Sequence, residues 1–293
     1  MPEREPRLGL LAETRRLLKQ GEELGGEQIA LVPDRSLDEL AQARLIISRS
    51  PGQPHELRYN PEDRQARDHL IAHEVGHLVR LHAAPPEERY LAAINGEARR
   101  LAGRKLLPYL EELARLGLPD RAIRQVFDIW HQGIVLQLAN APADLRIEQW
   151  LHQEHPALRE SQKHSLGNIL DRYALMQADP RFIQTPHVIR GANVELNAAV
   201  ALQYARLFRD QLFADQYPLY ITKRAELMLR EGLDAPDLGH EGDRQLTDQW
   251  AQRYALKGWY RWVPLAEAGQ LRRMLDRPDT QRAQRPPEGG EHP

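Results

Sequence analysis

Residues 68–82, DHLIAHEVGHLVRLH, place two histidines four positions apart, with a glutamate directly after the first. Histidines at positions i and i+4 lie one turn apart on the same face of a helix, so His73 and His77 can reach one ion from a rigid backbone. Glu74 is rotated away from this pair, which lets its carboxylate reach a water molecule bound to that ion. The pattern therefore predicts a metal site that carries its own general base.

The surrounding segment has the composition of an amphipathic helix from about residue 62 to residue 82. Asn60 is a candidate N-cap, and Pro61 suits the first turn. Gly76 stands in the helix interior, where glycine costs about 1 kcal/mol relative to alanine. We expect another element to approach the helix closely at this glycine. Without a metal, the two histidines would face apolar neighbours with unsatisfied ring nitrogens, which is unfavourable, so the metal site is the preferred interpretation.

A third ligand is needed, because a catalytic zinc site takes three protein ligands and leaves one position for water. The chain has no cysteine, so His, Asp or Glu must supply that ligand. Residues 140–150, NAPADLRIEQW, carry Asp144 and Glu148 four positions apart on one helical face. One carboxylate can bind the metal while the other accepts an N–H from a ligating histidine. We expect Asp144 to bind the metal and Glu148 to accept the N–H.

Two other assignments of the third ligand remain open. Glu148 itself can be the ligand, although a solvated helix face with Arg146 as its partner would also explain this glutamate. Glu97, in the stretch NGEARRLAGRKLLP, is the other alternative. Its neighbours are mostly charged, which favours a solvated glutamate. The sequence alone leaves all three carboxylates as candidates, with Asp144 preferred.

The stretch HELRYN followed by RDHLIAHEVGHLVRLH, within residues 55–82, resembles the strand and active helix of the zincin metallopeptidases. The AHExGH form is similar to that of the intracellular ImmA/IrrE-type metallopeptidases, and the distant acidic pair is similar to that of the gluzincins. The resemblance implies hydrolysis of peptide bonds with Zn²⁺ as the cofactor. It also implies Glu74 as the general base on a zinc-bound water, with His73 and His77 among the metal ligands.

The same resemblance implies two further parts of an active site. Zincins hold an extended peptide by backbone pairing to an edge strand, for which residues 45–48 and 55–59 are the candidates. The tetrahedral oxyanion needs a hydrogen-bond donor besides the metal. Nothing in the local sequence separates four candidate donors, which are His164, His187, Tyr217 and Tyr220.

Apolar patterning predicts a small sheet followed by many helices. Three short apolar runs, at 29–32, 45–47 and 55–59, predict strands of one sheet. Helices are predicted at about 6–24, 62–82, 86–114, 120–139, 142–153, 157–177, 192–214, 220–231, 244–257 and 264–275. We therefore expect a predominantly helical α+β fold of zincin-like type, with a small N-terminal β-sheet packed on the HExxH helix.

One catalytic-type domain with a helical addition is the simplest division of the chain. Residues 1–155 would form the zincin-like metallopeptidase domain, and residues 156–276 a helical C-terminal extension of the same domain. Residues 277–293, RPDTQRAQRPPEGGEHP, are polar and rich in proline and glycine, which predicts a disordered tail.

Composition excludes some function classes. The chain has 40 basic and 42 acidic residues, a net charge of -2, which argues against a dedicated nucleic-acid binder. No apolar run approaches the length needed to cross a membrane, and the N-terminus lacks the apolar region of a signal peptide. We expect a cytoplasmic protein whose partner is a peptide or protein substrate. The sequence does not indicate the oligomeric state.

Three functions fit these features. The first is a zinc metallopeptidase, a hydrolase of peptide bonds. The second is a regulatory metalloprotein of the ImmA/IrrE type that acts on one specific partner protein. The third is a non-catalytic scaffold that zinc only stabilises. Glu74 argues against the third function, because a structural metal site has no use for a base at that position. Nothing in the sequence separates the first two.

Overall fold

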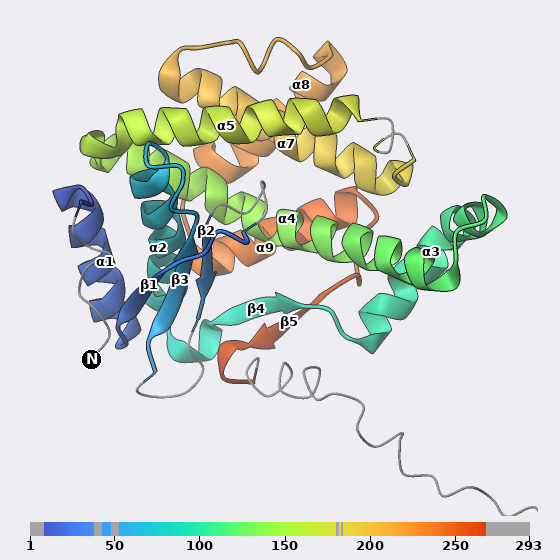
Figure 1. The fold of residues 1–293 in the computed structure, drawn as a ribbon, viewed down its shortest axis with the longest axis horizontal. Helices are drawn as coiled ribbons and strands as arrows, with labels where there is room; N and C mark the ends of the chain where they lie inside the picture. Colours follow the sequence, from blue (N-terminus) through green and yellow to red (C-terminus); the bar gives the residue numbers. More distant parts are fainter. Residues whose placement is uncertain (1–8, 38–42, 48–52, 180–181, 183, 268–293) are drawn as a thin grey trace, which may run out of the picture.

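The computed structural model describes residues 9–37, 43–47, 53–179, 182 and 184–267 (Figure 1). The N-terminal elements are α1 (Ala12–Gly25), β1 (Ile29–Pro33), β2 (Ala43–Ile46), β3 (His55–Tyr59) and α2 (Arg67–Ala83). The remaining elements are η2 (Pro86–Glu88), β4 (Tyr90–Ala93), α3 (Gly96–Arg115), α4 (Asp120–Glu154), η3 (Pro156–Leu158), α5 (Arg159–Ala178), α7 (His187–Phe208), α8 (Leu219–Leu229), η4 (Arg230–Asp234), α9 (Gly239–Arg253) and β5 (Arg261–Pro264). The fold is α+β and predominantly helical, as predicted. None of the helices in these residues is both long enough and apolar enough to span a membrane.

The three predicted strands form one sheet in the order β1-β3-β2. β1 is parallel to β3, and β2 is antiparallel to β3, so β2 is an edge strand. Alternate residues of β1 and β3 are buried, as period-2 patterning requires. The buried face of the sheet meets α1 and α2 in one apolar cluster that includes Leu18, Leu57, Ile71 and Leu78. The prediction of a small N-terminal sheet packed on the HExxH helix is therefore confirmed.

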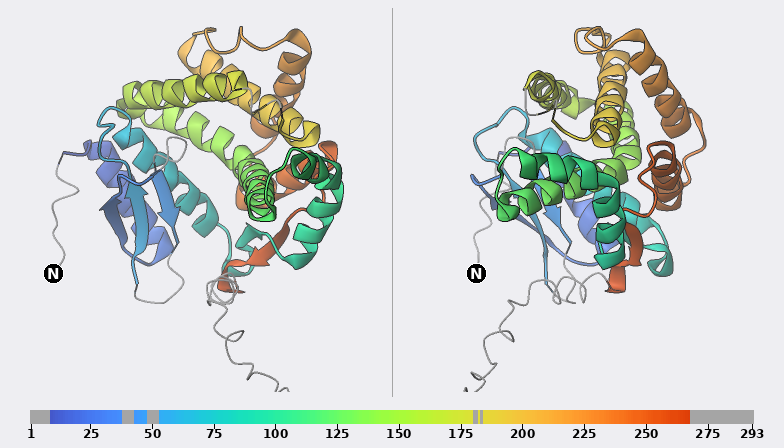
Figure 2. Two further views of the ribbon diagram at one scale, coloured as in Figure 1. Left: turned by 45° about the vertical axis from the view of Figure 1, so that its right-hand side comes forward. Right: turned by 90° about the vertical axis from the view of Figure 1, so that its right-hand side faces the viewer.

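The later helices enclose a second apolar cluster, with the fully buried Trp250 at α9 and Leu106 at α3. α4 contributes to both clusters, because Leu138 packs in the helical one while Ile147 packs against α2 and the sheet. In Figure 2, α4 runs from the α3 side of the molecule toward α2 and α5. The division into 1–155 and 156–276 stays a prediction, and the predicted tail 277–293 lies outside the described residues.

α4 is one continuous helix of 35 residues, where two helices at 120–139 and 142–153 were predicted. Pro142 lies inside it and lacks the N–H that would bond to the carbonyl four residues earlier. Residues on both sides of Pro142, among them Leu138 and Leu145, are buried, and this packing outweighs the lost hydrogen bond. The second half of the helix, which carries the two candidate carboxylates, is consequently held rigidly over α2.

Two further predictions differ from the structure. The helix predicted at 86–114 forms only from Gly96 onward, as α3; the residues before it include the strand β4, which pairs antiparallel with β5, far away in sequence. Such pairing leaves no local signal in the residues around either strand. Asn60 does not cap α2, which begins later, at Arg67. Instead, the Asn60 side chain accepts a hydrogen bond from the Glu62 N–H in the preceding turn.

Side chains from neighbouring helices fix both ends of α2. At its start, the buried Asp68 accepts hydrogen bonds from the Leu11 N–H at 2.7 Å and from the Thr14 hydroxyl at 2.6 Å. Toward its end, the Arg80 guanidinium donates to both carboxylate oxygens of Asp243 in α9, at 2.8 and 2.7 Å. The helix that carries the HExxH sequence is thereby held between α1 and α9.

Gly76 lies at a point where α2 packs closely against α4. A Cβ atom built on Gly76 would lie 2.7 Å from Cγ2 of Ile147, a distance that real Cβ atoms essentially never show. The sequence-based expectation that another element comes close at this glycine is confirmed. The close approach brings the second half of α4 toward the histidine-bearing turns of α2.

Gly76→Ala is expected to destabilise the protein by about 1–3 kcal/mol, because the added methyl group must push α4 away from α2. Gly133→Ala is the matched control, since Gly133 lies inside α4 and a Cβ there would meet no atom of the described residues within 4 Å. That variant is expected to gain up to about 1 kcal/mol from helix propensity. Denaturant unfolding measures both free energies of unfolding. If both variants were stabilised alike, the close approach at Gly76 would be refuted.

Candidate metal centre

α2 and α4 bring His73, His77 and Asp144 together. The Nε2 atoms of the two histidines lie 3.1 Å apart. Asp144 Oδ1 lies 3.0 Å from Nε2 of His77 and 3.4 Å from Nε2 of His73. The two histidines are on successive turns of α2, and the aspartate projects from the facing turn of α4. One oxygen and two nitrogens thus converge on a single point between the helices.

These separations fit a tetrahedral metal ion. Ligand atoms about 2.0–2.1 Å from zinc are about 3.3–3.4 Å from one another in a tetrahedral arrangement. Asp144 Oδ1 is buried, and within the described residues no donor is well aligned with it, although two ring nitrogens lie 3.0 and 3.4 Å away. A buried carboxylate oxygen without an aligned donor is unfavourable, and a cation between the three atoms would satisfy it. The residues present therefore suit a metal ion.

The side chains of this group remain partly open to solvent. The exposed fractions are 19% for His73, 23% for His77 and 33% for Asp144. Catalytic metal sites differ from structural ones in keeping one position open for water or substrate. The partial exposure of all three candidate ligands is compatible with such an open position.

Burial and nearby opposite charges shift the pKa values of Asp144 and His73 in this group. Burial alone would raise the pKa of Asp144, but the neighbouring His73 and His77 outweigh it and lower that pKa. Burial alone would lower the pKa of His73, but Asp144 and Glu148 raise it well above its usual value. Both shifts favour the charged form, so in the absence of a metal Asp144 and a protonated His73 form an ion pair.

Glu148 lies behind His73, on the side away from His77. Its Oε1 is 2.7 Å from Nδ1 of His73, and the side chain is only 4% exposed. Burial raises the pKa of Glu148, but electrostatic attraction and hydrogen bonds from His69 and His73 lower it far below its usual value. The structure therefore shows the expected contact between a second carboxylate and a histidine N–H. Glu148 does not join the His73–His77–Asp144 group.

The alternatives to Asp144 find little support in the geometry. The Arg146 guanidinium donates to the main-chain oxygens of Leu233 and Ala235, so a solvated pair of Arg146 with Glu148 is wrong. Glu97 is exposed in the first turn of α3 and belongs to neither group of candidate ligands in the described residues.

The Glu74 side chain contacts β2, the edge strand of the sheet. Its Oε2 accepts a hydrogen bond of 2.9 Å from the Leu45 N–H in β2. Glu74 is not one of the clustered candidate ligands, in keeping with its rotation away from the histidine pair. This hydrogen bond puts the carboxylate beside the backbone of β2.

The four candidate oxyanion donors have separate surroundings. His164 contacts Asn168 and Asp63, His187 contacts Tyr109, Tyr217 accepts from Gln177, and Tyr220 is mostly exposed. None of the four belongs to the candidate ligand groups among the described residues. The geometry selects none of them as the donor.

Two residues near the centre were missed by sequence reasoning. Tyr173 of α5 is partly buried, and burial together with the charge of Asp144 raises its pKa above the usual range. His69 contacts Glu148 and forms a second candidate group with it and His73. The spacing of 69, 73 and 77 on one helical face was the available signal for His69. No local signal marks Tyr173.

Comparison with known protein families, with curated proteins and with solved structures found no significant match.

Proposed function

We propose that this chain is a zinc-dependent metallopeptidase with a zincin-like active site. The observation that carries the proposal is the convergence of Nε2 of His73, Nε2 of His77 and Oδ1 of Asp144 between α2 and α4. Two imidazoles and one carboxylate with an open side form a ligand set typical of catalytic zinc. His73, His77 and Asp144 would hold the ion.

A zinc ion held there would supply Lewis-acid polarisation of a carbonyl group and an acidified water molecule. Glu74 would take the proton from the attacking water and pass it to the leaving amine. Its proposed role is supported by its position next to His73 and by its absence from the ligand group. Glu148 would hold His73 in the tautomer with its proton on Nδ1, leaving Nε2 free to bind.

The edge strand β2 supports a peptide as the substrate. Among the described strands β2 pairs only with β3, so its other side is open to an extended chain except where the Leu45 N–H bonds to Glu74. The contact between the Leu45 N–H and Glu74 puts this edge next to the proposed base. A peptide that added to the edge would run past the candidate metal centre, with its main chain within reach of Glu74.

Metal removal tests the proposal. Purified protein is expected to contain about one zinc ion per chain and to cleave members of a mixed peptide library, with products read by mass spectrometry. Dialysis against a chelator is expected to stop cleavage, and one equivalent of Zn²⁺ to restore it. The His73→Ala/His77→Ala double variant is the control and should gain no activity from added zinc.

Other outcomes assign the other functions. Cleavage that persists without metal would refute the metallopeptidase proposal. Bound zinc with no cleavage of any peptide, together with tight binding of one partner protein, would favour the regulatory alternative. Bound zinc whose removal unfolds the chain, with neither cleavage nor a partner, would favour the scaffold.

A further inference from the structure

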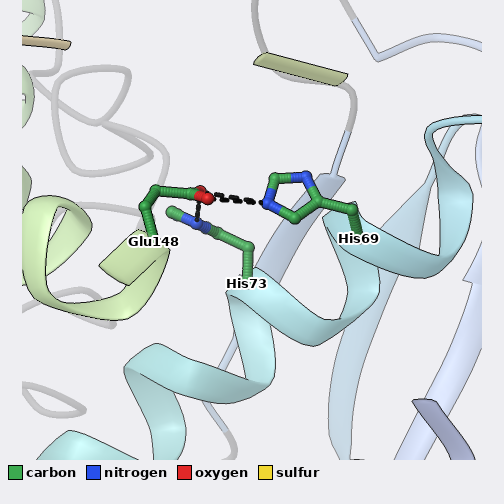
Figure 3. A group of neighbouring side chains, drawn as sticks. All are labelled: His69, His73 and Glu148. Atoms are coloured by element: carbon green, nitrogen blue, oxygen red, sulfur yellow. Dashed lines mark hydrogen bonds and ion pairs between the residues drawn. The ribbon is translucent and has the colours of Figure 1, made fainter. Parts of the chain in front are cut away.

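His69 is a third histidine on the face of α2 that carries the candidate ligands, and it is 1% exposed. Its Nε2 lies 3.1 Å from Oε1 and 2.9 Å from Oε2 of Glu148. Figure 3 shows His69 and His73 on successive turns of α2, with the Glu148 carboxylate between their rings. His69 therefore contacts the carboxylate that contacts the candidate ligand His73, and not the candidate metal position itself.

A second donor holds the same carboxylate from another helix. The Gln162 side-chain amide of α5 donates to Oε2 of Glu148 at 2.6 Å and to the Glu148 main-chain oxygen at 2.8 Å. Glu148 thus accepts hydrogen bonds from α2 on one side and from α5 on the other. All the polar partners of its buried carboxylate are donors, so the carboxylate has one favourable orientation.

The protons in this network can be assigned from the partners. Because Glu148 accepts only, His69 must donate from Nε2 and His73 from Nδ1. Nδ1 of His69 is buried and has no partner in the described part of the chain, so a proton there would be a buried, unsatisfied donor. His69 is therefore the Nε2–H tautomer. In the neutral form that a metal requires, His73 keeps its proton on Nδ1 and presents the lone pair of Nε2 toward His77 and Asp144.

We propose that His69 is a positioning residue for the metal centre, and this inference rests on the proposed function. His69, together with Gln162, fixes the plane of the Glu148 carboxylate. The fixed carboxylate sets the ring orientation and the tautomer of His73, so that Nε2 points at the metal position before any ion binds. Such preorganisation raises metal affinity, since less order must be imposed on binding.

A different interpretation makes His69, His73 and Glu148 a second metal site. The three residues offer ligand atoms close to one another. A metal there would have to displace the Nδ1 proton of His73 and the Nε2 proton of His69. It would also leave His73 bound to two ions. At 2.7–3.1 Å, both histidines already donate to the Glu148 carboxylate. These hydrogen bonds favour a hydrogen-bonded network over a second metal site.

Zinc affinity in three variants tests the proposal, measured by competition with a chromophoric chelator. His69→Leu is expected to bind zinc roughly tenfold more weakly than wild type, in the lower range for lost outer-shell contacts. His69→Gln keeps an N–H near the position of Nε2 and is expected to recover most of the affinity. His131→Leu is the matched control, because His131 is an equally buried histidine that donates to the Trp259 main-chain oxygen, away from the centre.

Gln162→Leu provides a second route to the same question if His69→Leu does not fold. It removes the other donor to Glu148 and is also expected to weaken zinc binding. Unchanged affinity in a folded His69→Leu or Gln162→Leu variant would overturn the proposal. So would a wild-type protein that binds two zinc ions and loses one of them in His69→Leu, which would establish the second site.

The tautomer of His73 gives a readout that needs no metal. Long-range ¹H–¹⁵N NMR spectra of the metal-free protein, recorded at a pH high enough to make His73 neutral, are expected to show its single proton on Nδ1. In His69→Leu, the spectra should show a mixture of tautomers. If wild type shows the Nδ1–H form but binds no zinc, the proposed function fails while the positioning role stands. If His69→Leu leaves a single Nδ1–H tautomer, the positioning role fails.

Discussion

Glu74→Gln is expected to reduce peptide hydrolysis by at least about 100-fold, because general-base catalysis is worth typically 10²- to 10⁴-fold. Glutamine has nearly the same size, and its side-chain oxygen can still accept the hydrogen bond from the Leu45 N–H. It cannot take a proton from the attacking water. Since Glu74 is outside the candidate ligand group, the variant should still bind zinc and fold normally.

Steady-state cleavage of one identified peptide and zinc content measure the two properties of Glu74→Gln separately. Glu97→Gln is the matched control, because Glu97 is an exposed glutamate in the first turn of α3. It is expected to keep full activity and full zinc content. Equal cleavage rates in Glu74→Gln and wild type would rule out Glu74 as the base. Loss of zinc in Glu74→Gln would instead make the glutamate a ligand.

Asp144→Ala is expected to weaken zinc binding by more than about 100-fold, which exceeds the 10- to 100-fold cost of losing an outer-shell partner of a ligand. The reason is that Oδ1 of Asp144 is the only carboxylate oxygen within 3.4 Å of both Nε2 atoms among the described ligand groups. Glu148→Ala is expected to lose about 10- to 100-fold, because Glu148 contacts His73 at Nδ1 and does not belong to the ligand group with His77 and Asp144.

A zinc titration of Asp144→Ala, Glu148→Ala and Glu97→Ala ranks the three carboxylates that the sequence leaves open. Glu97→Ala is expected to bind zinc as wild type does. If Glu97→Ala were the weakest binder, the assignment of Asp144 would be wrong. If Glu148→Ala were weaker than Asp144→Ala, Glu148 would be the ligand and the contact with Nδ1 of His73 would have to rearrange when metal binds.

The parts of the fold that follow local patterns could be predicted from the sequence. The apolar run at 29–32, the alternation of residues in 55–59 and the spacing of apolar residues in α2 are local patterns. Each predicted element forms, although α2 begins at Arg67 and not at about residue 62. β4 and β5 could not be predicted, because each strand is stabilised by hydrogen bonds to the other, which lies far away in the sequence. Pro142 gave a local stop signal that buried packing on both sides of it overrides.

The same distinction holds at the candidate site. The i, i+4 spacing of His73 with His77, and of Asp144 with Glu148, is local and could be predicted from the sequence. That the two pairs face each other depends on the packing of α4 against α2 at Gly76, which only the structure shows. Gln162 could not have been assigned, since a glutamine on a helix has no distinctive pattern and its role comes entirely from its contact with Glu148.

The most direct test of the central claim is a crystal structure of the zinc-loaded protein, with anomalous diffraction measured on both sides of the zinc absorption edge. One anomalous peak is expected between α2 and α4, about 2.0–2.2 Å from Nε2 of His73, Nε2 of His77 and Oδ1 of Asp144. A peak between His69, His73 and Glu148, a peak elsewhere on the molecule, or no peak at all would contradict the account.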